Sequence, residues 1–214
     1  IDTADWKPIP VEYGQETLSV RVPPGCTILS MKEIPPLADP RAAVEAALSH
    51  PIGSPTLEAI IAKKGKPAAE IRAAVTVSDI TRPVPYKGEK GILRPLLNRL
   101  EAAGIPRSGI TIVVGNGMHR PSTREEHVEM FGEDILRDYR IVDHNCEDLP
   151  SLTFVGKSQT GGDVFVNSVF YGADLRIATG LVESHYMAGL SGGRKSICPG
   201  LVDKRTIEKF HSPA

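Results

Sequence analysis

The feature that most limits the fold of this chain is an alternation, from Ala73 onward, of short β-branched runs with amphipathic helical segments. Ala73 to Ser78 and Ile110 to Gly115 have the composition of buried strands. Between them, a segment from about Gly88 to Ala103 repeats apolar residues at helical spacing. Such alternation is typical of a parallel α/β sheet. The sequence therefore predicts an α/β fold with a Rossmann-like, mostly parallel sheet flanked by helices.

The alternation continues toward the end of the chain. Ser122-Thr-Arg-Glu125 has the spacing of a capping box and predicts a helix that ends near Phe131. Beyond it we expect a short strand, a hairpin, a buried strand and a closing helix, at Arg140 to Asp143, Leu152 to Asn167, Leu175 to Thr179 and Asp203 to His211. The hairpin should turn around Thr160-Gly161-Gly162.

The residues before the sheet form a different pattern. Two β-like stretches, Thr17 to Val22 and Cys26 to Met31, are separated by Pro23-Pro-Gly25, which is turn chemistry. This arrangement predicts an N-terminal β-hairpin. Two helices should follow, from Asp39 to about His50 and from Ser54 to about Lys64, because each starts with a favoured N-cap residue followed by proline.

Composition limits the classes of function open to such a fold. The 214 residues are 41% hydrophobic and 24% charged, and the formal net charge of -1 indicates neither nucleic acid nor an anionic membrane surface as a partner. No apolar run approaches the roughly 20 residues of a membrane span, and no basic region followed by an apolar stretch stands at the start of the sequence, so we expect no leader segment. Cys26, Cys146 and Cys198 are scattered, so we expect free thiols and a cytoplasmic location.

Polar loops follow three of the predicted strands. They are Asp79-Ile-Thr-Arg-Pro-Val-Pro85, Gly115-Asn-Gly-Met-His-Arg-Pro121 and Gly180-Leu-Val-Glu-Ser-His185. In open α/β sheets, ligands bind in the crevice beyond the carboxyl ends of the strands. These loops are therefore the first place to look for a binding site.

Three side chains in these loops point to a small anionic substrate. If the strands are neighbours in the sheet, Arg82 could bind the carboxylate of a substrate, and His119 and His185 could transfer protons. Two alternatives are simpler: Arg82 could pair with Asp79 across a turn, and a lone histidine after a strand is more often an ordinary loop residue. The remaining histidines lack such a context and are expected at the surface; they are His50, His127 and His144.

The glycine-rich stretch Gly189-Leu-Ser-Gly-Gly-Arg-Lys-Ser196 resembles a phosphate-binding loop. It fails the P-loop pattern because Arg194 stands where a glycine should precede the lysine, so a Walker-type ATPase is disfavoured. Consecutive glycines still expose backbone N–H groups to a phosphate-bearing cofactor. Lys195 in such a loop could have a lowered pKa and act as a nucleophile. A flexible surface turn is the alternative.

Taken together, these segments are similar to the nickel-dependent lactate racemase family. The resemblance covers most of the chain from about Pro51. Its motifs are Ser78-Asp-Ile-Thr-Arg-Pro-Val-Pro85, His119-Arg-Pro-Ser-Thr123 and Glu183-Ser-His-Tyr-Met-Ala-Gly-Leu-Ser-Gly-Gly-Arg-Lys-Ser-Ile-Cys-Pro-Gly200. The third motif is long and specific, and His211 stands where the family has a histidine after the lysine.

The resemblance implies a cofactor, a nickel-pincer nucleotide in which sulfurs and a ring carbon of a pyridinium hold the metal. Lys195 would carry it covalently, and His211 would complete the nickel ligands. The residues implied around the nucleotide are Asp79, Gly192, Gly193, Arg194 and Ser196. Proteins that synthesise the cofactor would be partners, and residues 1–214 would form a single cofactor-binding and catalytic N-terminal domain.

The reaction implied is the racemisation or epimerisation of a small 2-hydroxy acid. His119 and His185 would flank the 2-carbon, and Arg82 and Tyr186 would contact the substrate. One histidine would remove the hydroxyl proton while hydride leaves the 2-carbon for the cofactor, and return from the other face would invert the centre.

Two departures from the family bear on this expectation. Ile80 stands where lactate racemases commonly have histidine, and Tyr186-Met187 alters the segment that faces the pocket. Lactate itself is therefore in question, and larger sugar acids are an alternative substrate. Family members also carry a C-terminal substrate-clamping domain that is absent from this chain, so a non-catalytic fragment that binds the nickel cofactor is the other alternative.

Overall fold

A computed structural model of the chain describes residues 3–14, 16–30, 34–159 and 161–212. By its internal contacts the chain divides into two compact units, residues 1–37 and 38–214. Within the described ranges, no helix is long and apolar enough to cross a membrane. Cys26, Cys146 and Cys198 are free thiols, as predicted.

The first unit contains the expected β-hairpin, but with a different partner strand. Strand β1 (Lys7–Tyr13) pairs antiparallel with β2 (Glu16–Val22), and no strand forms over residues 26–30. Gly14, at φ +62°, supplies the left-handed conformation that a tight hairpin turn needs. Prolines within β1 hide its alternation from a sequence reading, whereas an edge strand tolerates them. Residue 31, the end of the stretch predicted to pair, lies outside the described residues.

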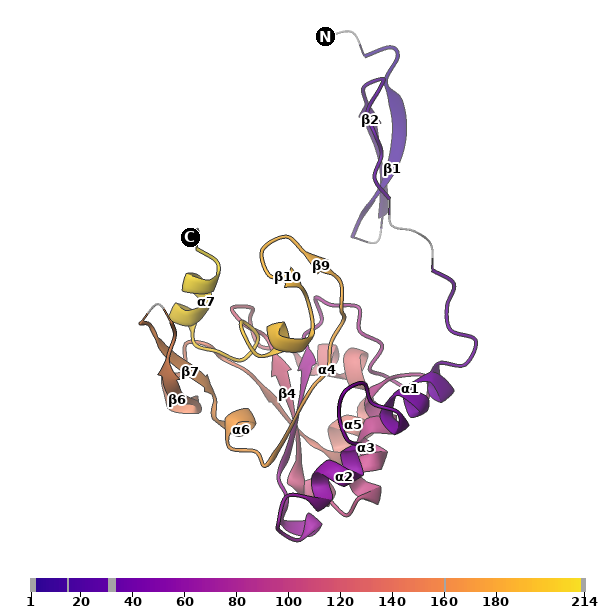
Figure 1. The fold of residues 1–214 in the computed structure, drawn as a ribbon. Helices are drawn as coiled ribbons and strands as arrows, with labels where there is room; N and C mark the ends of the chain where they lie inside the picture. The colour runs from indigo at the N-terminus through magenta and orange to yellow at the C-terminus, as the bar shows by residue number, and fades with distance from the viewer. Residues whose placement is uncertain (1–2, 15, 31–33, 160, 213–214) are drawn as a thin grey trace. The chain divides into compact units, whose positions relative to one another are not determined.

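The second unit is built on a four-stranded parallel sheet in the order β5-β4-β3-β8, which confirms the predicted fold class (Figure 1). The strands are β3 (Ala73–Ser78), β4 (Ile110–Gly115), β5 (Arg140–Asp143) and β8 (Leu175–Ala178). Strand β3 is central and almost entirely buried, as its β-branched composition predicts. It pairs with β4 from Ala73 opposite Ile110 to Ser78 opposite Gly115, so the two strands end together.

Layers on both faces bury the sheet (Figure 1). On one face lie the helices α1 (Pro40–Ser49), α2 (Leu57–Ala62), α3 (Leu93–Ala102), α4 (Arg124–Phe131) and α5 (Glu133–Asp138). The other face carries β6 (Leu152–Lys157), β7 (Asp163–Asn167), α6 (Ser168–Tyr171) and α7 (Lys204–Phe210). Short 3-10 turns cover Ala68–Glu70, Arg107–Gly109, Leu149–Ser151 and Gly193–Ser196.

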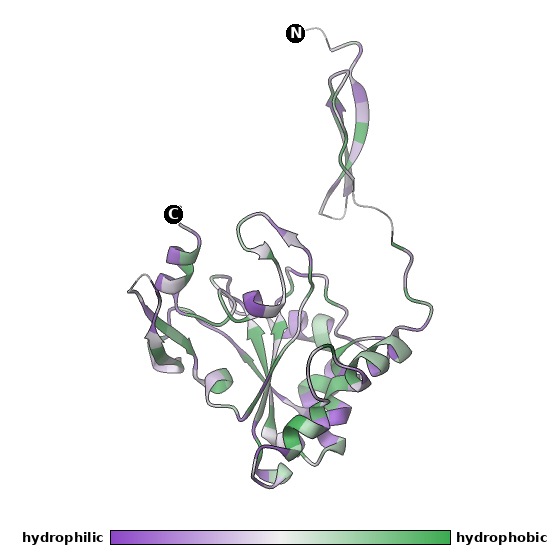
Figure 2. Cartoon of the chain, viewed as in Figure 1, coloured by the Kyte–Doolittle hydropathy of each residue, from purple (hydrophilic) through white to green (hydrophobic). Residues whose placement is uncertain are grey.

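Two apolar cores follow from the alternation of side chains along β3. Val75 and Val77 pack with Leu97 and other residues of the helical face, whereas Ala74 packs with Phe170 on the opposite face. Figure 2 shows the hydrophobic colour gathered in the central strands and on the helices beside them. Burial on both faces is what a parallel sheet requires.

Three helix starts differ from the sequence prediction. The helix expected from Gly88 begins at Leu93, because Gly88 adopts φ +77°, outside the helical range. The capping box is formed by Thr123 and Glu126 rather than Ser122 and Glu125. The helix expected from Ser54 begins at Leu57, with Thr56 as N-cap. In each case the helix begins later in the chain than predicted.

Two histidines expected at the surface lie inside the fold. His144 is fully buried, and its Nε2 lies 3.0 Å from the carbonyl oxygen of Val202. Burial lowers the pKa of His144, so the neutral ring is the folded form. His127 is largely buried, with Nε2 2.8 Å from Asp143 Oδ2. His50 is exposed as predicted.

Candidate active site

The loops after β3, β4 and β8 meet at the carboxyl edge of the sheet and line a pocket of about 240 Å³. Parallel strands place these loops on one side of the sheet, which is where such folds bind ligands. The predicted site residues that line the pocket are Asp79, Arg82, His119, His185, Tyr186, Gly192, Lys195, Ser196 and His211. Gly193 and Arg194 are exposed and are not part of the lining.

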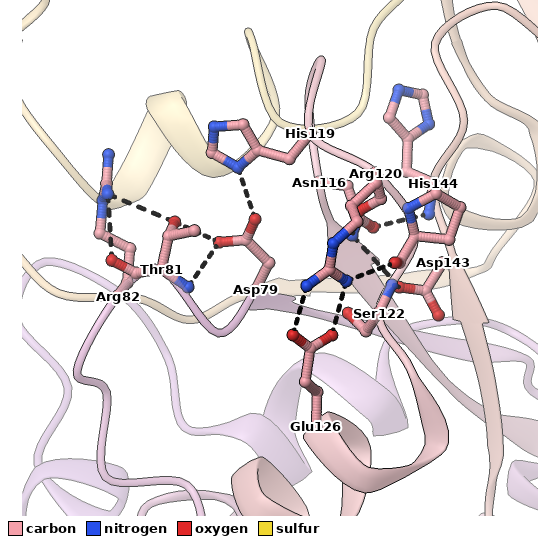
Figure 3. A network of polar contacts seen from close by, with 11 residues as sticks. Asp79, Thr81, Arg82, Asn116, His119, Arg120, Ser122, Glu126, Asp143 and His144 are labelled. Carbon is pink, nitrogen blue, oxygen red and sulfur yellow. Dashed lines mark hydrogen bonds and ion pairs between the residues drawn. The ribbon is translucent and has the colours of Figure 1, made fainter.

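Asp79 forms the central hydrogen bond of the site. Its Oδ2 lies 2.5 Å from His119 Nδ1, and its Oδ1 accepts hydrogen bonds from the Thr81 amide (3.2 Å) and hydroxyl (2.6 Å) (Figure 3). The Asp79 side chain is only 7% exposed, whereas that of His119 is 53% exposed. A buried carboxylate therefore holds an imidazole that faces the pocket.

Arg82 does not form the alternative ion pair with Asp79. Its guanidinium donates instead to the Thr81 carbonyl (3.2 Å) and hydroxyl (3.4 Å), and it lines the pocket. Because neither contact is to a carboxylate, the Arg82 charge is available to an anionic ligand.

A polar network fixes the loop that carries His119 (Figure 3). Asn116, at the end of β4, donates to the Arg120 carbonyl (3.1 Å) and to Asp143 Oδ1 (3.2 Å). The same Asp143 oxygen accepts from the Ser122 amide at 2.9 Å. Asn116 and Asp143 escaped the sequence analysis as site residues, although each lies where a predicted strand ends and so had the positional signal.

Arg120, next to His119, is bound by Glu126 of α4. It donates to both carboxylate oxygens of Glu126, at 2.8 and 2.6 Å. These hydrogen bonds, together with that from the Thr123 amide, lower the pKa of Glu126 to about 2. The first turn of α4 thus fastens the His119 loop by a charge-assisted, two-point contact.

His185 lies in a two-stranded hairpin of β9 (Ser184–His185) and β10 (Gly189–Leu190). Its Nδ1 accepts hydrogen bonds from the backbone amides of Met187 (3.2 Å) and Ala188 (3.1 Å). The Tyr186 ring stacks on the imidazole with centroids 5.2 Å apart, and Tyr186 is 93% exposed. Tyr186 therefore forms the outer wall of the pocket beside His185.

The charged groups near His185 are Lys195, Arg82, His211 and, with the opposite sign, Glu183. Desolvation lowers the pKa of His185, and the nearby charges of Lys195, Arg82 and His211 lower it further. The pKa of Lys195 is lowered for the same two reasons, burial first and then the Arg82 charge. Both groups are thus biased toward their neutral, nucleophilic or proton-accepting forms.

The glycine-rich loop is fastened to the end of the sheet rather than loose. Ser191 donates to the Leu181 carbonyl at 2.6 Å, and Ser196 donates to the Thr179 carbonyl at 3.2 Å. Gly192 adopts φ +67°, and a Cβ there would lie 2.8 Å from the Leu181 carbonyl oxygen. Hydrogen bonds therefore hold this segment at both Ser191 and Ser196.

The donor set of the pocket suits a metal carried by an organic group. Among the residues that the structure describes, no three His, Cys, Asp or Glu side chains cluster as a metal site. His211, directly after α7, supplies one imidazole to the pocket that also holds the Lys195 amine. If a metal-bearing group were bound at Lys195, the His211 imidazole would be a suitable ligand for a metal such as nickel.

Fold and pocket together define an α/β domain with a pocket at its strand ends that histidine, arginine and lysine side chains line. A sequence profile of the lactate racemase N-terminal domain matches residues 13–214, and the chain belongs to this family.

Two relatives and two solved structures show how far the similarity extends. The chain is 42% identical over 169 residues to a lactate racemase of Lactiplantibacillus plantarum and 33% identical over 168 residues to one of Thermoanaerobacterium thermosaccharolyticum. These matches cover 79% and 78% of this chain but 38% and 37% of the relatives. The chain therefore spans well under half the length of the relatives it matches.

The structural matches agree with the sequence matches. The lactate racemase apoprotein from Thermoanaerobacterium thermosaccharolyticum superposes with a TM-score of 0.75 at 31% identity, over 94% of this chain and 45% of that one. A Thermotoga maritima protein matches with a TM-score of 0.60 at 21% identity, over 81% of this chain and 41% of that one. The second match supports the fold alone.

Proposed function

We propose that this chain is the cofactor-binding and catalytic part of a racemase or epimerase that inverts the 2-carbon of a small 2-hydroxy acid. The observation that carries the proposal is the meeting of His119 and His185, from loops after different strands, in one pocket with Arg82. Two imidazoles can serve the two faces of one substrate carbon, and a guanidinium can hold the carboxylate beside it. Membership in the lactate racemase N-terminal domain family supports the same reaction class.

We assign the nickel-pincer nucleotide as the cofactor, with Lys195 as its covalent anchor and His211 as a nickel ligand. The lowered pKa of Lys195 favours the neutral amine that such a bond needs. When bound, the cofactor supplies reversible hydride acceptance at the substrate 2-carbon. Asp79, Gly192 and Ser196 line the same pocket, whereas Gly193 and Arg194 are exposed and lie outside its lining.

The chain's own residues supply the proton transfers. One histidine takes the substrate hydroxyl proton while the 2-carbon gives up hydride, which leaves a planar 2-oxo acid. The second histidine must start this step as an imidazolium; it gives its proton to the oxygen when hydride returns to the opposite face, and the first histidine then releases its extra proton to solvent. Arg82 keeps the carboxylate fixed, so that only the reacting carbon changes face.

The substrate is a 2-hydroxy acid whose side chain meets Tyr186. Because Tyr186 is exposed beside His185, a larger sugar acid has room at this side of the pocket. Tyr186 and Met187 line the pocket between β9 and β10, so discrimination between 2-hydroxy acids falls to these two side chains. A panel of 2-hydroxy acids assayed with the full-length protein would identify the substrate class.

The test is to co-express the chain with proteins that synthesise the cofactor, and to measure intact mass and nickel on one sample. We expect a covalent mass increment at Lys195 with nickel in equimolar amount. Lys195→Arg should lose the increment, and His211→Ala should keep the increment but lose most of the nickel. An unmodified chain under these conditions would contradict the cofactor assignment.

Racemisation activity is measured on the full-length protein. It distinguishes an enzyme from a non-catalytic module that only binds the cofactor. His119→Ala and His185→Ala should each abolish racemisation, measured by chiral chromatography, while the mass increment stays. Wild-type turnover in either variant would remove that histidine from the proposal. A loaded wild-type protein with no turnover on any 2-hydroxy acid would favour the non-catalytic alternative.

A further inference from the structure

The two pocket histidines differ in what their Nδ1 atoms contact. His119 Nδ1 lies 2.5 Å from a carboxylate oxygen of Asp79. His185 Nδ1 faces two hydrogen-bond donors, the amides of Met187 and Ala188, at 3.2 and 3.1 Å. One ring therefore meets an acceptor where the other meets donors.

This difference assigns the neutral tautomer of each ring. A neutral imidazole carries one N–H, and an ionised carboxylate only accepts, so His119 holds its proton on Nδ1 and leaves the Nε2 lone pair free. Backbone amides only donate, so His185 keeps the Nδ1 lone pair and carries its proton on Nε2. Figure 3 shows the second ring nitrogen of His119 directed away from Asp79.

We propose that Asp79 is a positioning residue that keeps the Nε2 lone pair of His119 available to accept a proton. The Met187 and Ala188 amides hold His185 in the opposite tautomer. This inference rests on the proposed function, in which both rings exchange the hydroxyl proton. Only the substrate enantiomer whose hydroxyl faces His119 meets a free Nε2 lone pair. To accept a proton at Nε2, His185 must first leave the amides of its own hairpin turn.

The contacts of the second Asp79 oxygen fix how the side-chain amide would lie in Asp79→Asn. Oδ1 accepts from the Thr81 amide, a group that cannot act as an acceptor. In Asp79→Asn, the side-chain oxygen must therefore stay at Thr81, and the NH₂ group must face His119 Nδ1. A donor at that place forces Nδ1 to accept and moves the proton of His119 to Nε2. The same substitution in a serine protease triad acts through the wrong tautomer.

The direct test is ¹⁵N NMR of the histidine rings in this 214-residue chain, without cofactor, at a pH above which the ring signals no longer change. His119→Gln and His185→Gln identify the two sets of signals. We expect Nδ1–H for His119 and Nε2–H for His185. In Asp79→Asn, His119 should change to Nε2–H while His185 stays unchanged.

Asp174→Asn is the matched control. It also removes a carboxylate that accepts a backbone amide, that of Arg72 at 2.8 Å, but Asp174 lies outside the pocket lining. This variant should keep both wild-type tautomers. The proposal is overturned if the two histidines share one tautomer in the wild-type chain, or if Asp79→Asn leaves His119 as Nδ1–H.

A kinetic measurement on the loaded full-length protein separates positioning from a structural role. Asp79→Asn should lower kcat by roughly 10²- to 10⁴-fold with a small change in KM and an unchanged cofactor mass. An unchanged kcat would refute the positioning role. If the tautomers are as assigned but the wild-type protein turns over no 2-hydroxy acid, the proposed function fails, whereas the tautomer assignment stands.

Discussion

Buried polar side chains concentrate at the strand ends of this domain and hold its loops. The buried polar residues are Thr76, Asp79, Asn116, His144, Asn167, Ser191 and Asp203. Asp79, Asn116 and Ser191 each bond to a loop that lines the pocket. A buried polar group is costly unless it is paired, so each of these bonds specifies one loop conformation.

His144 provides a residue-scale prediction about pH and stability. Burial lowers its folded-state pKa below the unfolded value of about 6.5, so the stabilisation is complete above that pH and is lost as pH falls below it. His144→Ala should lower the free energy of unfolding by about 2–3 kcal/mol at neutral pH, because the Val202 carbonyl loses its partner and a cavity forms.

Urea unfolding across a pH series checks this prediction. The wild-type chain should lose stability on the acid side of about pH 6.5 more steeply than His144→Ala. The exposed His50 gives the control, since His50→Ala should keep the wild-type dependence. Equal slopes for the wild-type chain and His144→Ala would show that His144 is not the titrating group.

At the scale of elements, short connections decide where each functional group lies. The end of β4 passes directly into the loop of His119, and the β9–β10 hairpin carries His185. The 3-10 turn Gly193–Ser196 then brings Lys195 back to the strand ends. The loop of His119 is bonded to Asp143 of β5, and the 3-10 turn is bonded to Thr179 directly after β8.

The two adjacent glycines of this turn should respond differently to alanine. Both have positive φ, but a Cβ at Gly192 would lie 2.8 Å from the Leu181 carbonyl oxygen, whereas a Cβ at Gly193 would meet nothing within 4 Å. Gly192→Ala should therefore cost about 2–4 kcal/mol and displace the loop, and Gly193→Ala about 1 kcal/mol from backbone strain alone.

Denaturant unfolding and the yield of the Lys195 adduct measure these two effects. Gly192→Ala should lower both the unfolding midpoint and the adduct yield, while Gly193→Ala should keep most of the adduct. Equal behaviour of the two variants would mean that the close approach at Leu181 does not constrain the loop.

At the scale of the whole molecule, the second unit contains both apolar cores and the complete pocket. Every residue of the two cores lies between positions 48 and 207, and the pocket lining begins at Val77. The first unit is a two-stranded hairpin, which is marginal as an isolated structure.

Removal of residues 1–37 should therefore leave a folded domain. We expect residues 38–214 to keep cooperative unfolding and a midpoint within a few degrees of the full chain. Thermal unfolding followed by circular dichroism tests this, with the Lys195 adduct as a second readout. Non-cooperative unfolding of the shortened chain would show that residues 1–37 belong to one folding unit with the rest, as the single-domain prediction has it.

Much of this organisation can be predicted from sequence because it depends on local patterns. The β-branched runs at Ala73 and Ile110 indicate buried strands, and Asp39 caps its helix as expected. The order of polar loops after strands then predicts the edge of the sheet where the pocket lies. Periodicity and capping depend on residues a few positions apart, so they can be recognised from the sequence alone.

Only the tertiary structure decided how the predicted site residues are connected. The sequence by itself determined the fold class and placed Asp79, His119 and His185 in loops after strands, yet it left Asp79 equally free to pair with Arg82. The contact with His119 arises because β3 and β4 are neighbours that end in register, which brings together side chains 40 positions apart. His144 was misplaced at the surface for the same reason: its burial comes from Val202, 58 positions away. Hydrogen-bond partners this far apart in the sequence depend on strand order and register, and local sequence patterns determine neither.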